Sequence, residues 1–519
     1  MKNFKRFKFI LSFLLIFVLG MPINALASED EFVVGMEVNY APFNFSQTND
    51  ENGAVAVRNS EGEYANGYDV AMAQKIADSL GKKLVIVKTE WDGLAPALTS
   101  GKIDAIIAGM SPTPEREKEI DFSDNYYASD LVIVVKKGSK YENAKSLDDF
   151  KNSKITGQLN TFHYSVIDQI PSVKKQTAME SFPSMISAVK VGKIDGYVSE
   201  KPGAMSAQTS NPDLTYVEFD ENKGFKTDPK DTSIAVGLKK GSDLKDKINE
   251  ILKNIPQKER DEIMQKMVSI GEGDSNISFL GQMKDILAKY GSLFVSGTVN
   301  TMAIAIFSTI AGFIIGLFVT MIRRIPVDKK RNPFTFFIHK IINFILVAYI
   351  EVFRGTPMMV QSMLIFYGSK QFLNINMDSM PAALFIVSIN TGAYLSEVIR
   401  GGINSIDNGQ FEACKAIGLS HTQTYLSVIL PQTIRTILPS IGNEFVVNIK
   451  DSSVLNVISV TELFFISKSI AGSTYQIFQT YLVTAIIYFV LTFIVTRLLL
   501  LLENRLNVGD FKLESEDLK

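Results

Sequence analysis

The chain has 519 residues, too many for one compact core, so two or three domains are expected. Its formal net charge is −2, which excludes a general attraction to nucleic acid. Its single cysteine, Cys414, excludes an intrachain disulfide, and we expect a small packing residue there. Charged residues are dense from Glu29 to Asp274, and long apolar stretches take over beyond Ile277, so a soluble half precedes a membrane-embedded half.

Residues 1–28 are predicted to form a secretory signal peptide. Basic residues precede an apolar run from Phe9 to Leu19, and small residues follow around Ala25 and Ala27. Cleavage after Ala27 exports the domain that follows. An uncleaved segment exports the same domain and stays behind as an extra membrane anchor.

Strand-like and helix-like runs alternate through the exported half. FVVGMEV, KLVIVKTE and IDAIIAGM read as strands, whereas YDVAMAQKIADSLG and WDGLAPALTSG have helical spacing. This alternation predicts an α/β domain with mostly parallel strands. Two similar strands, VIVVKKGSK from Val132 and IAVGLKKGSD from Ile234, bracket a further α/β unit. They favour two lobes that close on a ligand by hinge motion, with chance recurrence as the alternative.

The second half predicts about five membrane spans. Thr301–Ile322 is long enough to cross, and the basic residues after it place that loop in the cytoplasm. FFIHKIINFILVAYIEVF is apolar but charged, and is a candidate to lie along the inner face rather than cross. The predicted crossings that follow are GTPMMVQSMLIFYG, PAALFIVSINTGAYLSEVI, YLSVILPQTIRTILPSIGNEFVVNI with its continuation, and YLVTAIIYFVLTFIVTRLLLLL. The polar stretch after Gly409 and the C-terminus then face the cytoplasm.

Both halves resemble the ABC importers of polar amino acids. The exported half is similar to their binding proteins in YAPFNF, GYDVAMAQKIADSLG and EWDGLAPALTSGKIDAIIAGMSPTPEREKEIDFSDNYY. The membrane half is similar to their permeases in IEVFRGTPMMVQ, EACKAIGLS and LPQTIRTILPS. The resemblance covers almost the whole chain after the signal. It implies a fused receptor–permease subunit of a kind known mostly from Gram-positive bacteria.

The resemblance implies a two-lobed α/β clamshell of the type II periplasmic-binding-protein class, followed by an all-α transmembrane permease domain of the type I importers. The expected division is a signal peptide at 1–28, an extracellular amino-acid-binding domain at 29–270, a linker at 271–285, the permease at 286–510 and a cytoplasmic tail at 511–519. The chain would be a multi-pass protein of the cell membrane. About five spans are few for alternating access, so a homodimer is the simplest assembly, and pairing with a different permease is the alternative.

The stretch EACKAIGLS matches the family's EAA loop, with Cys414 where the family more often has alanine. In the family this helix docks on a separate ATPase, and Glu412, Ala413 and Gly418 carry over as coupling residues. An amphipathic helix that ends at a glycine suits such docking. The sequence has no G-x-x-x-x-G-K-[ST] motif, so ATP and Mg²⁺ are expected on the partner. No cofactor, metal or enzymatic activity is expected in this chain.

The motif GMSPTPERE suits the carboxylate of an amino acid. Thr113 before Pro114 predicts a helix N-cap, whose free N–H groups attract anions. Arg116 adds a bidentate donor. By resemblance, Gly109, Ser111 and Arg116 match the family's carboxylate clamp.

The remaining ligand contacts come from the resemblance. Glu200 stands where the family usually has the aspartate that binds the ammonium group, and Thr161 falls on its G-T loop. Tyr40 and Trp91 match the aromatic residues beside the ligand's aliphatic stem. Glu37 matches an acid of binders of cationic amino acids, although some glutamine binders carry one too. We expect lysine, arginine, histidine or ornithine as substrate, with glutamine or glutamate as the alternative.

Asn390, Tyr394 and Glu397 lie in or near one span and are candidates for the translocation pathway. Glu397 either holds a passing cation or pairs with Arg400. His163 is expected at the surface.

Other classes of protein fit the sequence less well. A ligand-gated ion channel needs a selectivity loop such as T-V-G-Y-G, which the sequence lacks. A tethered chemosensor needs a signalling domain, for which the tail NVGDFKLESEDLK is too short. No nucleophile–base arrangement that would indicate an enzyme stands out in the sequence.

Overall fold

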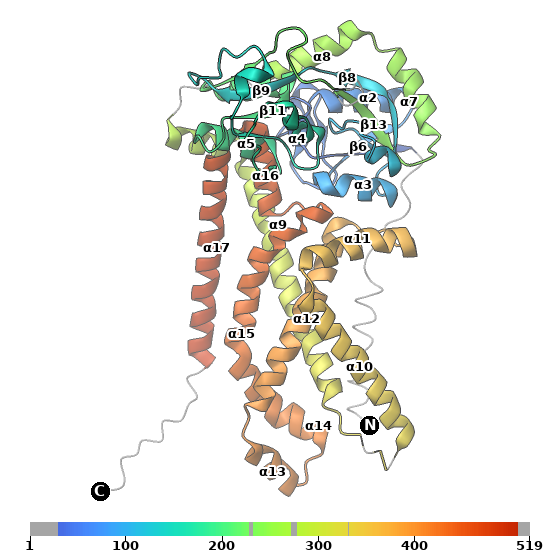
Figure 1. Cartoon of the computed structure of the whole chain (residues 1–519). Coiled ribbons are helices and arrows are strands. Elements are labelled where there is room, and N and C mark those ends of the chain that lie inside the picture. Colours follow the sequence, from blue (N-terminus) through green and yellow to red (C-terminus); the bar gives the residue numbers. More distant parts are fainter. Residues whose placement is uncertain (1–29, 228–231, 271–277, 328, 331, 507–519) are drawn as a thin grey trace, which may run out of the picture.

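The computed structural model describes residues 30–227, 232–270, 278–327, 329–330 and 332–506, and Figure 1 shows two parts, an α/β domain and a set of long helices beneath it. The predicted signal peptide, with its cleavage site, and the predicted tail lie outside the described residues. The helix α9 begins at Phe279, so the last part of the predicted linker is helical.

The first lobe of the α/β domain is built on a five-stranded sheet. Its strands are, in order, β6 (Lys83–Lys88), β1 (Glu31–Met36), β7 (Ala105–Ile106), β13 (Ser233–Leu238) and β8 (Asp121–Ala128). Its helices are α2 (Tyr68–Ser79), α3 (Trp91–Thr99), α7 (Leu244–Lys253) and α8 (Gln257–Ile270). A smaller sheet has the order β2 (Asn39–Tyr40), β3 (Asn44–Gln47), β5 (Tyr64–Asn66) and β4 (Val55–Ala56).

The second lobe has a four-stranded sheet in the order β10 (Ile155–Thr156), β11 (Gly196–Glu200), β9 (Leu131–Lys136) and β12 (Leu214–Val217). Its helices are α4 (Phe162–Ser165), α5 (Phe182–Lys190) and α6 (Lys201–Ser210). The two similar strands of the sequence are β9 and β13, one in each lobe, which confirms the two-lobed fold.

The prediction of mostly parallel strands is wrong. β1 pairs in parallel with β6 and β7, but β13 runs antiparallel to β7 and β8. In the second lobe β9 runs antiparallel to both β11 and β12. The chain enters β9 and β13 from the other lobe rather than through a helical crossover, which is why these strands reverse the direction of their sheets.

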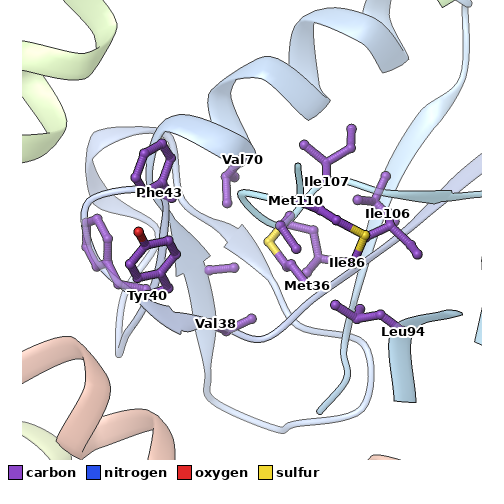
Figure 2. Close-up of a cluster of buried hydrophobic side chains, with 14 of the residues drawn as sticks. Met36, Val38, Tyr40, Phe43, Val70, Ile86, Leu94, Ile106, Ile107 and Met110 are labelled. Carbon is purple, nitrogen blue, oxygen red and sulfur yellow. The ribbon is translucent and has the colours of Figure 1, made fainter. Parts of the chain in front are cut away.

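Apolar side chains from the sheet and from α2 form the core of the first lobe. Figure 2 shows part of it, with Met36, Ile86 and Ile106 from three neighbouring strands and Val70 from α2. Tyr40 lies at the edge of the residues drawn, and its hydroxyl donates to Glu200 of the second lobe. That edge is where the two lobes meet.

The second part of the chain consists of long helices. They are α9 (Phe279–Arg323), α10 (Pro333–Gly355), α11 (Met358–Leu373), α12 (Ser379–Asn404), α13 (Asn408–Ala416), α14 (His421–Thr424), α15 (Leu430–Asp451), α16 (Leu463–Thr474) and α17 (Ile477–Leu506). By length and composition, four of the described helices are able to cross a membrane, or up to five if the bent pair His421–Ile458 and Leu463–Thr474 counts as one span. The expectation of about five spans matches the upper count.

The assignment of individual crossings needs a correction at α10 and α11. The charged segment expected to lie along the inner face is α10, a candidate span of 23 residues. The segment GTPMMVQSMLIFYG forms α11, which has only 16 residues and lies beneath α3 of the first lobe (Figure 1). At 1.5 Å per residue α11 extends about 24 Å, short of the roughly 30 Å of a bilayer core.

The α/β domain is docked on the helices through specific contacts. The Tyr475 hydroxyl donates to Ala41 O at 2.6 Å, and Lys102 Nζ donates to Met377 O at 2.9 Å. Gly472 allows α16 to approach β2 closely, because a Cβ at this position would lie 2.3 Å from Asn39 O. The cores of the two parts form one continuous apolar cluster.

Candidate functional site

A small pocket lies between the two lobes. The described residues around it are Glu37, Tyr40, Trp91, Ala108, Gly109, Ser111, Arg116, Gln158, Thr161, Phe162, His163, Phe182 and Glu200. The structure therefore brings together all eight positions of the binding domain that the sequence analysis selected. Their roles toward a ligand remain predictions, whereas their convergence is a feature of the fold.

Arg116 lines the pocket and is held by backbone acceptors. Its Nη1 donates to Ser111 O at 2.9 Å, and its guanidinium stacks over the Trp91 ring at 5.1 Å from the centroid. Burial lowers the pKa of Arg116 to about 10, which leaves it charged at neutral pH. The Gly109 backbone has φ +63° against the Tyr40 ring, a conformation and spacing that favour glycine.

The helix predicted after Thr113 is a single 3₁₀ turn, Arg116–Lys118. Thr113 O accepts from Glu117 N at 2.9 Å, but no longer helix follows within the described part of this loop. The predicted helix is therefore reduced to a short turn, although Arg116 N still donates to Thr113 Oγ1 at 3.5 Å as at a helix start. The anion site stays a prediction, in which a carboxylate would rely mainly on the guanidinium of Arg116 and on the groups of Gly109 and Ser111.

The lobes touch each other beside Arg116. Its Nη2 donates to Asn160 O of the second lobe at 2.9 Å, and Asn160 Nδ2 donates to Asp92 Oδ1 at 3.3 Å. Asn160 has φ +58°, which explains how it replaces a glycine, since asparagine tolerates this region better than most residues. Thr161 follows and donates to Gln158 O at 2.8 Å.

Glu200 also lines the pocket and is 2% exposed. The Tyr40 hydroxyl donates to Glu200 Oε2 at 2.5 Å, and His163 Nε2 lies 2.8 Å from Glu200 Oε1. Burial disfavours the charge of Glu200, but His163 and Tyr40 outweigh it and hold the pKa below its usual value. The carboxylate is therefore ionised, as a partner for an ammonium group must be.

The prediction that His163 lies at the surface is wrong, because it is 4% exposed and faces the pocket. Four other pocket residues, Ala108, Gln158, Phe162 and Phe182, were not selected from the sequence. Phe182 stacks on Tyr40 with ring centroids 4.7 Å apart and an interplanar angle of 8°. His163 stands two residues after Thr161, and this proximity to the predicted ligand-binding loop is the local feature of the sequence that could have indicated it.

Glu37 lines the pocket from the first lobe and is 6% exposed. Burial raises its pKa to about 8, and the nearby carboxylate of Glu90 adds to this effect, whereas Lys468 of α16 opposes it. Below that pH the group is mostly neutral. A cation placed beside Glu37 would restore its charge, so the site is suited to a ligand that brings one.

The pathway candidates occupy one side of α12. Asn390 Nδ2 donates to Phe353 O at 3.1 Å and to Gln361 Oε1 at 3.0 Å. Tyr394 is 39% exposed. Glu397 pairs with Arg400 at 2.7 Å and with Arg323 at 3.2 Å, so the structure has the ion-pair alternative for this carboxylate.

The predicted coupling loop, Glu412–Gly418, lies at the end of the helices farthest from the binding domain, in α13 and the turn before α14 (Figure 1). Glu412 and Ala413 are exposed, and Cys414 is 4% exposed and packs inward, as expected for a small core residue. Gly418 ends the helix with φ +76°, and Leu419 N donates to Cys414 O at 3.0 Å. Ile417 beside it is 75% exposed, so the loop presents an apolar side chain.

Comparisons with known proteins agree with this architecture. The family of bacterial extracellular solute-binding proteins, family 3, matches residues 32–269. The family described as binding-protein-dependent transport system inner membrane component matches residues 334–508. The two families divide the chain where the structure changes from the α/β domain to the helices.

Individual relatives were found for both parts. The nopaline transport system permease protein NocM of Agrobacterium fabrum is 33% identical over 40% of this chain and 85% of its own length. The probable amino-acid permease protein YxeN of Bacillus subtilis is 38% identical over 37% of this chain and 81% of its own length. A solved amino acid ABC transporter substrate-binding protein from Streptococcus pneumoniae, bound to L-arginine, is 28% identical with a TM-score of 0.40, over 46% of this chain and 95% of its own. The chain belongs to the binding-protein-dependent amino-acid ABC transporters, with the solute-binding protein and the permease fused in one polypeptide.

Proposed function

We propose that this chain captures a basic L-amino acid outside the cell and passes it through the membrane, driven by a separate ATPase. The observation that carries the substrate class is the buried carboxyl of Glu37 in the pocket between the lobes. Arg116 and Glu200, which both line the pocket, match the opposite charges that every free amino acid presents. Glu37 is then a third charged group, available for a cationic side chain.

Glutamine or glutamate is the alternative substrate. A protonated Glu37 donates a hydrogen bond to an amide or carboxylate oxygen, which its pKa of about 8 permits at neutral pH. The names of the permease relatives do not choose between these substrates, since they include nopaline, arginine and glutamine systems. The ligand class therefore rests on the binding pocket.

The loop from Glu412 to Gly418 is the proposed contact with the ATPase. It is exposed, lies farthest from the binding domain and presents the apolar Ile417. An exposed helix with an apolar side chain suits a hydrophobic groove on a partner. In this proposal the binding domain faces the outside, the loop and the C-terminus face the cytoplasm, and two copies of the chain form the pathway.

The test is calorimetric titration of the full-length chain in lipid nanodiscs with each common amino acid and ornithine. We expect arginine or lysine to bind, and Arg116→Ala to weaken this binding by about tenfold to a hundredfold, because a charge-assisted contact is lost. Arg58→Ala is the matched control, because Arg58 pairs with Glu31 on the surface outside the pocket. It should bind as the wild type does.

Glu37→Gln separates the two substrate classes. Loss of arginine binding in this variant supports a basic substrate. Binding of glutamine that survives Glu37→Gln assigns the importer to the alternative class. If no amino acid binds the wild-type chain, the proposed function is wrong.

A further inference from the structure

The helix α16 of the permease reaches the binding domain next to the ligand pocket. It contacts β2, β3 and α5, and Figure 1 shows it directly beneath α5. Lys468 on this helix forms an ion pair with Glu90 of the first lobe. The ammonium group is therefore provided by the permease and the carboxylate by the binding domain.

Glu90 belongs to the structure that supports the pocket. It is the N-cap residue of α3, and the first residue of that helix is Trp91, which lines the pocket. Glu90 is 9% exposed, and its Oε2 is buried without a hydrogen-bond partner among the residues that the structure describes. This carboxylate therefore has one oxygen on Lys468 and one that is able to accept a further bond.

Glu37 and Glu90 follow neighbouring strand ends, because Thr89 N donates to Met36 O at 2.9 Å, and Lys468 pairs with Glu90. We call Glu37 and Glu90 the acid pair. The charge of Glu90 raises the pKa of the Glu37 carboxyl and the charge of Lys468 opposes this effect. Asp92, Tyr481, Lys88 and Tyr367 are further titratable groups that interact with members of this cluster. Lys88 has its own buried partner, Glu63, so Lys468 is the cation that pairs with Glu90.

A second interface lysine has a different environment. Lys102 Nζ donates to Asn376 Oδ1 at 3.2 Å and to Met377 O at 2.9 Å, and stacks over the Phe366 ring. These acceptors are neutral and belong to the permease. Lys102 therefore contributes to docking without pairing with a carboxylate beside the pocket. A Lys102 variant can thus serve as the comparison for a Lys468 variant.

We propose that Lys468 of the permease competes with the cationic side chain of the substrate. In the docked state Lys468 neutralises the Glu37–Glu90 acid pair and so weakens the binding of a positively charged ligand side chain. This inference rests on the proposed function as a carrier of basic amino acids. In the undocked domain the acid pair is free to bind the ligand's cation. Docking then replaces that cation by Lys468, and the ligand is released toward the membrane part.

The effect is specific for charge. A neutral ligand of the same shape makes no use of the acid pair, so Lys468 should not alter its affinity. By linkage, a ligand that competes with Lys468 weakens docking by the same factor by which docking weakens its binding. Arginine and citrulline are a suitable pair, because a ureido group replaces the guanidinium with little change in shape.

The test compares the two ligands on full-length protein in nanodiscs by calorimetric titration. Lys468→Gln should tighten arginine binding by about tenfold and leave citrulline binding unchanged, because a buried charge pair competes with one ligand only. Lys468→Arg keeps the cation and should bind both ligands as the wild type does. Lys102→Gln weakens docking but leaves Lys468 in place, so by linkage it should tighten arginine binding less than Lys468→Gln does and leave citrulline binding unchanged.

The ratio of the two affinities decides the outcome. If Lys468→Gln changes arginine and citrulline equally, or changes neither, Lys468 is only a docking contact and the inference is wrong. If arginine binds and Lys468→Gln weakens it, the inference is also wrong, while the proposed function stands. If neither ligand binds any variant and no other amino acid binds, the proposed function fails together with the inference.

Discussion

Glu37 is an acid that the fold buries next to two others, Glu90 and Asp92. Burial raises its pKa to about 8, so at neutral pH most molecules carry a protonated Glu37. A cationic ligand side chain needs the carboxylate, so its binding below that pH must expel a proton. For the proposed basic substrate, this residue is therefore predicted to link affinity to pH.

The affinity for arginine should rise with pH, by up to about tenfold per unit from about pH 6 to about pH 8, and level off above. Citrulline should show no such rise. Titrations near neutral pH in buffers of different ionisation enthalpy should show release of about one proton per arginine bound. Glu37→Gln should remove both effects, and a pH dependence that persists in this variant would assign it to another group.

The sequence motifs identified the pocket well, because its residues lie at strand ends and loops whose chemistry is local. Arg116, Ser111 and Gly109 stand in one short motif and meet in space as expected. His163 and Lys468 were not recognised, because their partners come from distant segments. Lys468 meets Glu90 across 378 residues of chain, and no sequence pattern predicts such a contact.

At the scale of helices, the length of a segment indicates whether it can cross the membrane better than its charged residues do. The charged residues of α10 suggested a surface helix, but most of the helix is apolar and its 23 residues are long enough to cross a membrane. α11 looked like a span by composition and is too short for one. Its position under α3 depends on the docked domain, which no property of the segment itself indicates.

The close approach of α16 to β2 gives a testable prediction for docking. In Gly472→Ala the new methyl group would overlap Asn39 O, which should weaken docking by about 1–3 kcal/mol, the usual cost of overpacking. We expect substrate uptake to fall while arginine still binds. Energy transfer between dyes on the binding domain and on α9 measures the undocked fraction.

Gly291→Ala is the matched control. It is also a glycine in a helix, and a Cβ there meets open space. The substitution should leave docking unchanged and slightly stabilise α9, since alanine is the better helix former. Equal uptake by Gly472→Ala and Gly291→Ala would show that this contact is not needed for transport.

At the scale of the whole molecule, polar groups on one side of α12 are exposed and have no partner surface within the described chain. Tyr394 is 39% exposed, and the Arg354 guanidinium stacks over its ring at 5.5 Å from the centroid. Arg354 and Glu351 of α10 are themselves exposed. Charged side chains on membrane helices are costly in contact with lipid, so this side should face water or a second chain.

We therefore expect two copies of the chain to assemble with these surfaces toward each other. In a Cys414→Ala background, Tyr394→Cys should form crosslinked dimers with a short thiol reagent in membranes. Thr391→Cys on the same helix should not, because Thr391 is fully buried against α9 and α15. Native mass spectrometry should give about twice the mass of one chain. A single-chain mass together with no crosslink at Tyr394 would mean that the pathway is completed by a different permease subunit, since one chain leaves these polar groups without a partner surface.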